Sequence, residues 1–184
     1  GMNASKSLFK ILENPNIDLK LKHRVFNEFL IFAVKNSIYL KDIDAAILYF
    51  DTDRAINVSK EVAKFFWKKN DVENAAKYFD IAIKKEAEDI EAMELYLEVL
   101  VQKSDFQLVT KKATDYLDMF PTQPVFYLYA GLGYNQIKEF KKGKNILENG
   151  LDFVIENKAL VANFYKELII SCENLNDKAK MQWY

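Results

Sequence analysis

The chain has 184 residues and half of them are hydrophobic, which is enough to bury the continuous core of a single domain. Its 26 basic and 27 acidic residues are mixed along the chain and leave a formal net charge of −1, so no long-range field favours nucleic acid or an anionic membrane. Only Arg24 and Arg54 carry the guanidinium group best suited to phosphate and guanine. We therefore expect no nucleic-acid partner, and the sequence has no apolar run of about 18 residues that would span a membrane.

The balance of residue types predicts an all-α fold. Glycine occurs 5 times and proline 3 times, while lysine, glutamate, leucine and alanine are abundant. Residues that break helices or form tight turns are therefore scarce. Such a composition favours helices joined by short loops over a strand-rich fold.

The N-terminal part of the chain predicts irregular helices. An amphipathic helix over 5–13 is ended by Asn14, Pro15 and Asn16, and Asp18 then caps a longer helix with an apolar stripe from Val25 to Ala33. A further helix is expected over 42–50, followed by a polar break over 51–54. We assign residues 1–55 to an N-terminal cap of degenerate helical repeats.

The middle of the chain repeats with a period of 34 residues. Phe66, Leu100 and Tyr134 mark the first half of each copy, and Val72, Phe106 and Phe140 follow three polar turns. The pattern predicts helices over 56–69, 73–86, 89–102, 106–119, 124–137 and 141–155. A helix pair of this size cannot bury its apolar face alone, so residues 56–155 are expected to form three stacked pairs.

The period slips by a few residues after Ile155. A helix over 160–175 is followed by 177–184, which we assign together with the residues from 156 onward to a partial C-terminal repeat of the same continuous domain. Met181, Trp183 and Tyr184 would leave apolar surface at this end unless they fold back. Gly1 before Met2 is typical of a residue left by tag cleavage, and we expect a fragment of a longer protein.

The repeats resemble tetratricopeptide repeats. In the first repeat the small residues of that pattern fall on Ala63, Ala75 and Ala82, and in the third they include Ala130-Gly131 and Gly143. The resemblance implies a right-handed superhelical solenoid of antiparallel helix pairs. It also implies a non-enzymatic scaffold that binds a protein or peptide partner in its concave groove.

A narrower resemblance connects the chain to tetratricopeptide proteins typical of Bacteroidetes. The residues that carry it are 120–124, 129–131, 147–151 and 163–165, whereas Leu168-Ile169-Ile170 stand where that group favours glycine. Members are usually exported or lipid-anchored and have further repeats downstream. The resemblance implies a periplasmic or lipid-anchored protein, and without it a cytoplasmic location is expected.

The groove can be projected from the 34-residue pattern, because the first helix of each pair lines the concave face in this family. The projected positions are Asn57, Lys60, Lys64 and Trp67 in the first repeat, Glu91, Glu94, Glu98 and Val101 in the second, and Val125, Leu128, Leu132 and Asn135 in the third. A surface that changes from basic to acidic to apolar suits a peptide with the opposite charges and one apolar end. The alternative is that Lys60 and Lys64 pair with Glu94 and Glu98 across adjacent helices, which is worth about 0–1 kcal/mol if the pairs are exposed.

A different binding mode of the family, the carboxylate clamp for a chaperone tail, is disfavoured. It needs basic or amide side chains in successive first helices, where this chain has Glu94, Glu98, Leu128, Leu132 and Tyr129. Acidic side chains would repel a terminal carboxylate.

Self-assembly is an alternative to binding a different protein. Trp183 and Tyr184 could pack against the end repeat of a second copy and form a homodimer through the C-terminal repeat.

Catalysis is not expected. Cys172 is the only cysteine and His23 the only histidine, and neither is surrounded by a companion motif. The sequence contains no glycine-rich phosphate loop and no Cys/His cluster with metal-ligand spacing. We predict no cofactor and no metal, with Cys172 buried in a helix and His23 on an exposed helix face.

Overall fold

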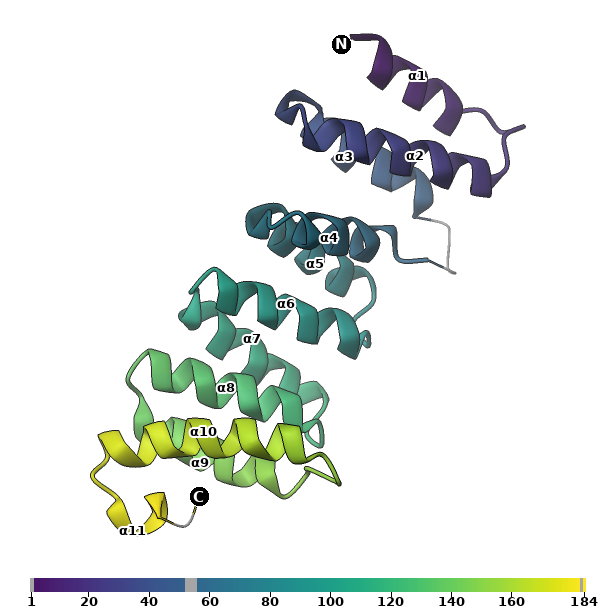
Figure 1. Ribbon diagram of the computed structural model, residues 1–184. Coiled ribbons are helices and arrows are strands. Elements are labelled where there is room, and N and C mark those ends of the chain that lie inside the picture. Colours follow the sequence, from purple (N-terminus) through teal and green to yellow (C-terminus); the bar gives the residue numbers. More distant parts are fainter. Residues whose placement is uncertain (1, 52–55, 183) are drawn as a thin grey trace.

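The computed structural model describes residues 2–51, 56–182 and 184, and within these ranges every regular element is a helix (Figure 1). The α-helices are α1 (Met2–Leu12), α2 (Leu19–Val34), α3 (Leu40–Ile47), α4 (Val58–Lys68), α5 (Val72–Lys85), α6 (Ile90–Gln102), α7 (Phe106–Met119), α8 (Pro124–Gln136), α9 (Phe140–Leu151), α10 (Lys158–Asn174) and α11 (Lys178–Met181). Short 3-10 helices, η1 (Ser37–Tyr39) and η2 (Leu48–Phe50), flank α3. The prediction of an all-α fold is confirmed.

The helices form hairpins that stack in chain order. Figure 1 shows α4 with α5, α6 with α7 and α8 with α9 following one another along the molecule, with α1 to α3 at one end and α10 and α11 at the other. Each hairpin packs on the next, so the chain is an α–α solenoid whose two termini lie at opposite ends.

The 34-residue period has a structural cause at the turn inside each hairpin. Asn70, Ser104 and Lys138 all have a positive φ of 59–65°, the conformation in which a helix ends and the chain reverses. One residue further on, a backbone N–H closes the turn by donating to the carbonyl of Phe66, Leu100 or Tyr134 at 2.8–3.0 Å. The three residues that mark the period in the sequence are therefore the ones whose carbonyls end each first helix.

The next turn of this kind comes four residues later than the period requires. Asn176 has a φ of 56°, and the N–H of Asp177 donates to the carbonyl of Cys172 at 2.9 Å. The extra length of α10 accounts for the slip: α10 begins at Lys158, in register with Pro124 of α8, but has 17 residues where α6 and α8 have 13. Separately, α9 ends at Leu151, earlier than the predicted 155.

The N-terminal helices also differ from their predicted bounds. The expected helix over 42–50 is split into α3 and the 3-10 helix η2, and the helix expected over 5–13 begins already at Met2. The polar break over 51–54 falls almost entirely outside the described residues.

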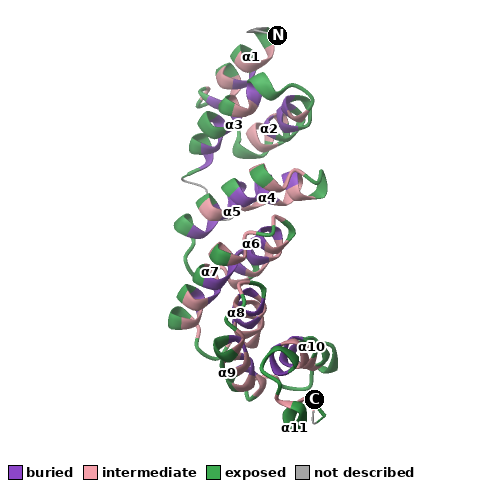
Figure 2. Cartoon of the chain, turned by 90° about the vertical axis from the view of Figure 1, so that its left-hand side faces the viewer, coloured by how far each residue is buried: buried purple, intermediate pink, exposed green. Residues whose placement is uncertain are grey.

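Buried residues lie on the helix faces that are turned toward neighbouring helices (Figure 2). One core cluster of buried apolar residues runs from α1 to α8, and a smaller one is built from Leu147, Phe164 and Leu168 of α9 and α10. Close approach between α8 and α9 needs glycine, since a Cβ on Gly150 would lie 2.3 Å from the Cβ of Tyr127. Residues 168–170 of α10 stand where the group named above favours glycine, and Leu168 is fully buried there.

Candidate protein-interaction surface

The two lysines of the projected groove are held by α6. Lys60 Nζ lies 2.7 Å from Asp89 Oδ2 and 2.7 Å from Glu91 Oε2, and Lys64 Nζ lies 2.8 Å from Glu91 Oε1. Burial acts to lower the pKa of Lys60, but its bonds to the two carboxylates outweigh burial and raise that pKa. The hydrogen bonds from Lys60 and Lys64 lower the pKa of Glu91 to about 2.

This arrangement corrects the predicted pairing. The lysines bond to Asp89 and Glu91 and not to Glu94 and Glu98, because the first turn of α6 faces α4. The basic end of the projected groove is thus neutralised inside the molecule, whereas the acidic pair is not.

Glu94 and Glu98 remain without a cationic partner among the ion pairs of the described residues. Both side chains are half-buried on α6. Burial and then the neighbouring charges of Glu98 and Glu91 raise the pKa of Glu94. Burial and the two glutamates also raise the pKa of Tyr129 on α8, so this tyrosine faces the same acidic pair.

Apolar side chains of α8 continue the surface beyond Tyr129. Val125, Leu128 and Leu132 are half-buried, and Leu128 also packs against the smaller core cluster. The α6–α8 surface, defined here as Glu94, Glu98, Tyr129, Leu128 and Leu132, therefore combines unpaired negative charge with accessible apolar groups.

Two other projected groove residues lie in the interior. Asn57 is 8% exposed, caps α4 through the N–H of Lys60 and donates to the carbonyl of Ala82. Asn135 is 4% exposed, donates to Glu167 and accepts a hydrogen bond from Ser171 at 2.7 Å. These amides join helices to one another and are not available on the groove surface.

Glu167 and Ser171 are two interior polar residues that the sequence analysis does not predict. Both are buried in α10, opposite Asn135 of α8. Both residues lie four positions later than the 34-residue pattern requires, because of the four-residue slip in α10. The pattern therefore does not align them with the matching residues of α6 and α8.

Trp67 lies at the edge of the projected surface. It is half-buried, and its Nε1 donates to Gln102 Oε1 at 3.2 Å, so the indole bridges α4 and the end of α6. Val101, one residue before Gln102, is also half-buried.

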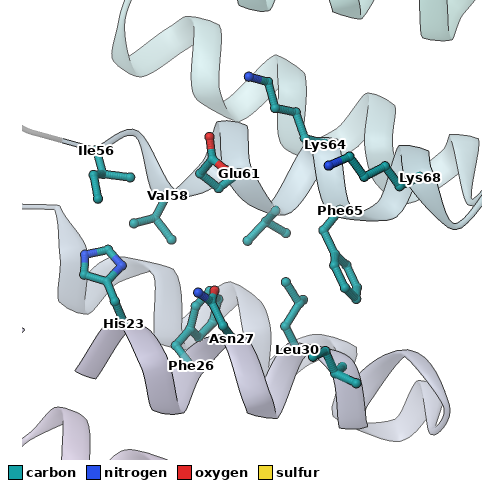
Figure 3. Close-up of a pocket in the computed structure, with 12 residues that line it drawn as sticks. His23, Phe26, Asn27, Leu30, Ile56, Val58, Glu61, Lys64, Phe65 and Lys68 are labelled. Carbon is teal, nitrogen blue, oxygen red and sulfur yellow. The ribbon is translucent and has the colours of Figure 1, made fainter. Parts of the chain in front are cut away.

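A cleft of about 540 Å³ separates α2 from α4 (Figure 3). Its floor is formed by Phe26 and Leu30 of α2 and by Val58 and Val62 of α4, each of them at most 4% exposed. Three apolar side chains stand at its rim: Ile31, which is 47% exposed, Ile56, which is 42% exposed, and Phe65. The sequence predicted the apolar stripe of α2 but not that it would stand apart from the next first helix.

The C-terminal end folds back on the last hairpin. The ring of Tyr184 lies 5.6 Å from that of Tyr165, and its hydroxyl donates to Glu148 Oε1 at 2.8 Å. Of the apolar residues expected to protrude there, Tyr184 and Met181 are half-buried, and Trp183 lies outside the described residues.

The single cysteine and the single histidine both lie at least partly in the interior. Cys172 is buried in α10, as predicted, and burial raises the pKa of its thiol. The prediction for His23 is wrong, because the ring is half-buried and lies 4.4 Å from that of Phe50. Over the described ranges, His, Cys, Asp and Glu side chains nowhere gather in a group of three that could hold a metal ion, and no helix is long and apolar enough to cross a membrane.

Solved structures with the same architecture are found by comparison. The first tetratricopeptide domain of human RPAP3 superposes with a TM-score of 0.55 over 65% of this chain and 94% of its own, at 12% identity. MamA of Desulfovibrio magneticus RS-1, from residue 41 to its end, gives a TM-score of 0.61 over 86% of this chain and 88% of its own, at 13% identity. The fold is tetratricopeptide-like.

The tetratricopeptide-like fold is the extent of that similarity. MamA AMB-1 superposes with a TM-score of 0.58 at only 10% identity, over 85% of this chain. No family model and no curated protein matches the sequence.

Proposed function

We propose that the chain is a non-enzymatic scaffold that binds a segment of a protein partner on the α6–α8 surface. The observation that carries the proposal is the contrast between the two charged pairs of the first helices. Lys60 and Lys64 are satisfied by Asp89 and Glu91, whereas Glu94 and Glu98 have no such partner in the described chain. An incoming cation is therefore the group that this surface lacks.

The partner segment carries basic residues next to an apolar one. A lysine or arginine between Glu94 and Glu98 relieves the repulsion that, in addition to burial, raises the pKa of Glu94. Leu128 and Leu132 lie further along the same surface and remain half-exposed to receive an apolar side chain. The partner segment needs no acidic residues, because Lys60 and Lys64 are already paired inside the molecule. The predicted ligand is therefore narrower than a peptide with charges of both signs.

A peptide-display selection tests the proposal. Random peptides selected on the wild-type chain are expected to be enriched in Lys or Arg beside Leu, Ile or Phe. The double variant Glu94→Gln/Glu98→Gln keeps side-chain shape and is expected to lose about tenfold or more in affinity for these peptides. The matched control is Glu86→Gln/Glu88→Gln, which removes two charges from exposed residues outside this surface.

The proposal fails if the enriched peptides bind the Glu94→Gln/Glu98→Gln variant as tightly as the wild type. It also fails if the control variant loses as much, since the effect would then come from net charge and not from the α6–α8 surface.

Location and self-assembly stay predictions. The resemblance to the Bacteroidetes group favours a periplasmic or lipid-anchored protein, which fractionation of the source cells would test. A homodimer through the C-terminal repeat would form around Tyr184, which packs on Tyr165 and bonds to Glu148, and sedimentation at several concentrations would test it.

A further inference from the structure

We infer that the α2–α4 cleft is a second docking site, which takes a bulky apolar side chain from a protein segment with acidic residues next to it. The cleft does not share residues with the α6–α8 surface, so the inference does not rest on the function proposed there. Its volume of about 540 Å³ lies within the range of sites that enclose a specific group.

The cleft exists because one position of the repeat is filled differently in α4. Leu95 of α6 and Tyr129 of α8 lie 34 and 68 residues after Glu61, and both are half-buried against the core. After the four-residue slip the same position is Glu167, buried against Asn135. Glu61 instead is exposed, and Figure 3 shows its carboxylate turned away from α2. No side chain at this position therefore fills the space between α2 and α4.

The walls of the cleft are apolar and accessible from outside. Figure 3 shows Phe65 reaching from α4 toward α2, with Leu30 opposite it. Ile31 and Ile56 each expose nearly half of their surface, which is costly for two isoleucines that line one cleft unless something covers them.

The charge at one end of the cleft selects an acidic occupant. Lys64, Lys68 and Lys69 lie on and beside the turn that carries Phe65, and Lys69 Nζ lies 5.9 Å from the centre of the Phe65 ring. Lys64 is bonded to Glu91, whereas Lys68 and Lys69 make no ion pair within the described residues. Two unpaired cations beside an apolar slot favour carboxylates next to the inserted side chain.

The other side of the junction is closed by bonds between side chains. Asp44 of α3 bonds to Lys77 and to the hydroxyl of Tyr78, and Asp51 bonds to Lys85. These bonds hold the second helices together while the first helices stay apart. The slot therefore opens on the first-helix side only.

The test is a selection of random displayed peptides on the Glu94→Gln/Glu98→Gln background, in which binding to the α6–α8 surface is expected to be weakened. The expected result is enrichment of peptides that carry Phe, Trp, Leu or Ile with Asp or Glu within a few residues. Synthetic versions of those peptides are then titrated against two variants: Ile31→Ser/Ile56→Ser, which removes the apolar rim, and Lys68→Glu/Lys69→Glu, which reverses the charge. Each is expected to weaken binding about tenfold or more.

Matched controls separate this result from damage to the fold. Ile81→Ser alters an exposed isoleucine on α5, and Lys111→Glu/Lys141→Glu reverses two exposed lysines on α7 and α9. Neither is expected to change the titration, and all variants are expected to keep the wild-type circular dichroism spectrum.

Four outcomes overturn the inference. Peptides that bind the Ile31→Ser/Ile56→Ser variant unchanged do not occupy the cleft. Enriched peptides that carry Lys or Arg in place of acidic residues contradict the predicted chemistry, and so does an absence of any enrichment. If sedimentation instead shows a wild-type dimer that Ile31→Ser/Ile56→Ser converts to a monomer, the occupant is a second copy of this chain.

Discussion

The hairpin of α2 and α3 meets the hairpin of α4 and α5 along two edges. Side chains bond the second helices, α3 and α5, to each other, whereas a cleft separates the first helices, α2 and α4. On the second-helix side, Asp44 and Asp51 bond to residues 33 and 34 positions later along the chain. On the first-helix side, a cleft of about 540 Å³ remains. Two neighbouring hairpins of a repeat can therefore be joined by side-chain bonds between their second helices while a cleft remains between their first helices.

The hairpins further along the chain close both edges. At the next junction, Lys112 bonds to Asp80 on the second-helix side, and Lys60 bonds to Glu91 on the first-helix side. The difference between the two regions therefore depends on a few side chains and can be altered by substitution.

The largest expected difference between the two regions is in the free energy of unfolding that is lost when a buried aromatic ring is removed. Phe126 in α8 is fully buried, so Phe126→Ala is expected to lower the free energy of unfolding by about 3–5 kcal/mol. Phe26 is equally buried but forms the floor of the cleft, so the space left by Phe26→Ala joins an existing opening and the loss should be smaller, about 2–3 kcal/mol. Urea unfolding of the two variants measures both values, and equal losses would mean that the cleft does not relax the site.

Removing the bonds of Asp44 to α5 should destabilise the N-terminal helices selectively. Asp44→Ala leaves the hydroxyl of the buried Tyr78 without its acceptor, which costs about 1–3 kcal/mol. Amide hydrogen exchange is the measurement, with faster exchange expected in α1 to α3 and little change in α6 to α9. Lys111→Ala serves as the control, and a uniform rise in exchange along the chain would contradict the selective effect.

Filling the open edge should have the opposite effect. Glu61→Leu places in α4 the residue that α6 has at the same position, Leu95, and should bury part of an apolar side chain against α2. The expected gain is about 1 kcal/mol, roughly half the value for a fully buried leucine. Exchange in α2 measures the gain, and Glu61→Gln, which removes the charge without adding apolar surface, should give none of it.

Much of this arrangement could be predicted from the sequence because it is periodic. Phe66, Leu100 and Tyr134 locate three turns, since the carbonyl of each accepts the backbone bond that closes the turn after its helix. The all-α solenoid follows from that repetition together with the scarcity of glycine and proline.

The features that could not be predicted depend on distances between helices. The pairing of Lys60 with Asp89 and Glu91 depends on how closely α6 approaches α4, and a helical pattern contains no such information. Asn135 occupies a groove position by count but turns inward, because the longer α10 brings Glu167 and Ser171 opposite it. The cleft likewise depends on the direction of the Glu61 side chain, which the 34-residue pattern does not contain.

The smallest expected effect compares Glu91 and Glu94, two glutamates three residues apart on α6 with pKa shifts of opposite sign. The pKa of Glu91 is lowered from 4.5 to about 2, so its ion pairs stabilise the fold fully above pH 4.5 and are lost as the pH falls from 4.5 toward 2. The pKa of Glu94 is raised, so its ionised form destabilises the fold at neutral pH, and this cost disappears as the pH falls through that raised value.

Urea unfolding of two variants at two pH values tests the opposition. At pH 7, Glu91→Gln should lower and Glu94→Gln should raise the free energy of unfolding, each by only about 0.3–0.5 kcal/mol because both groups are accessible to solvent. At pH 3 the effect of Glu91→Gln should persist in part, since that carboxyl still ionises in the folded chain, whereas the effect of Glu94→Gln should be gone. The same sign for both variants at pH 7 would mean that Glu94 has a cationic partner in solution, and the α6–α8 surface would then lose the unpaired charge on which its proposed role depends.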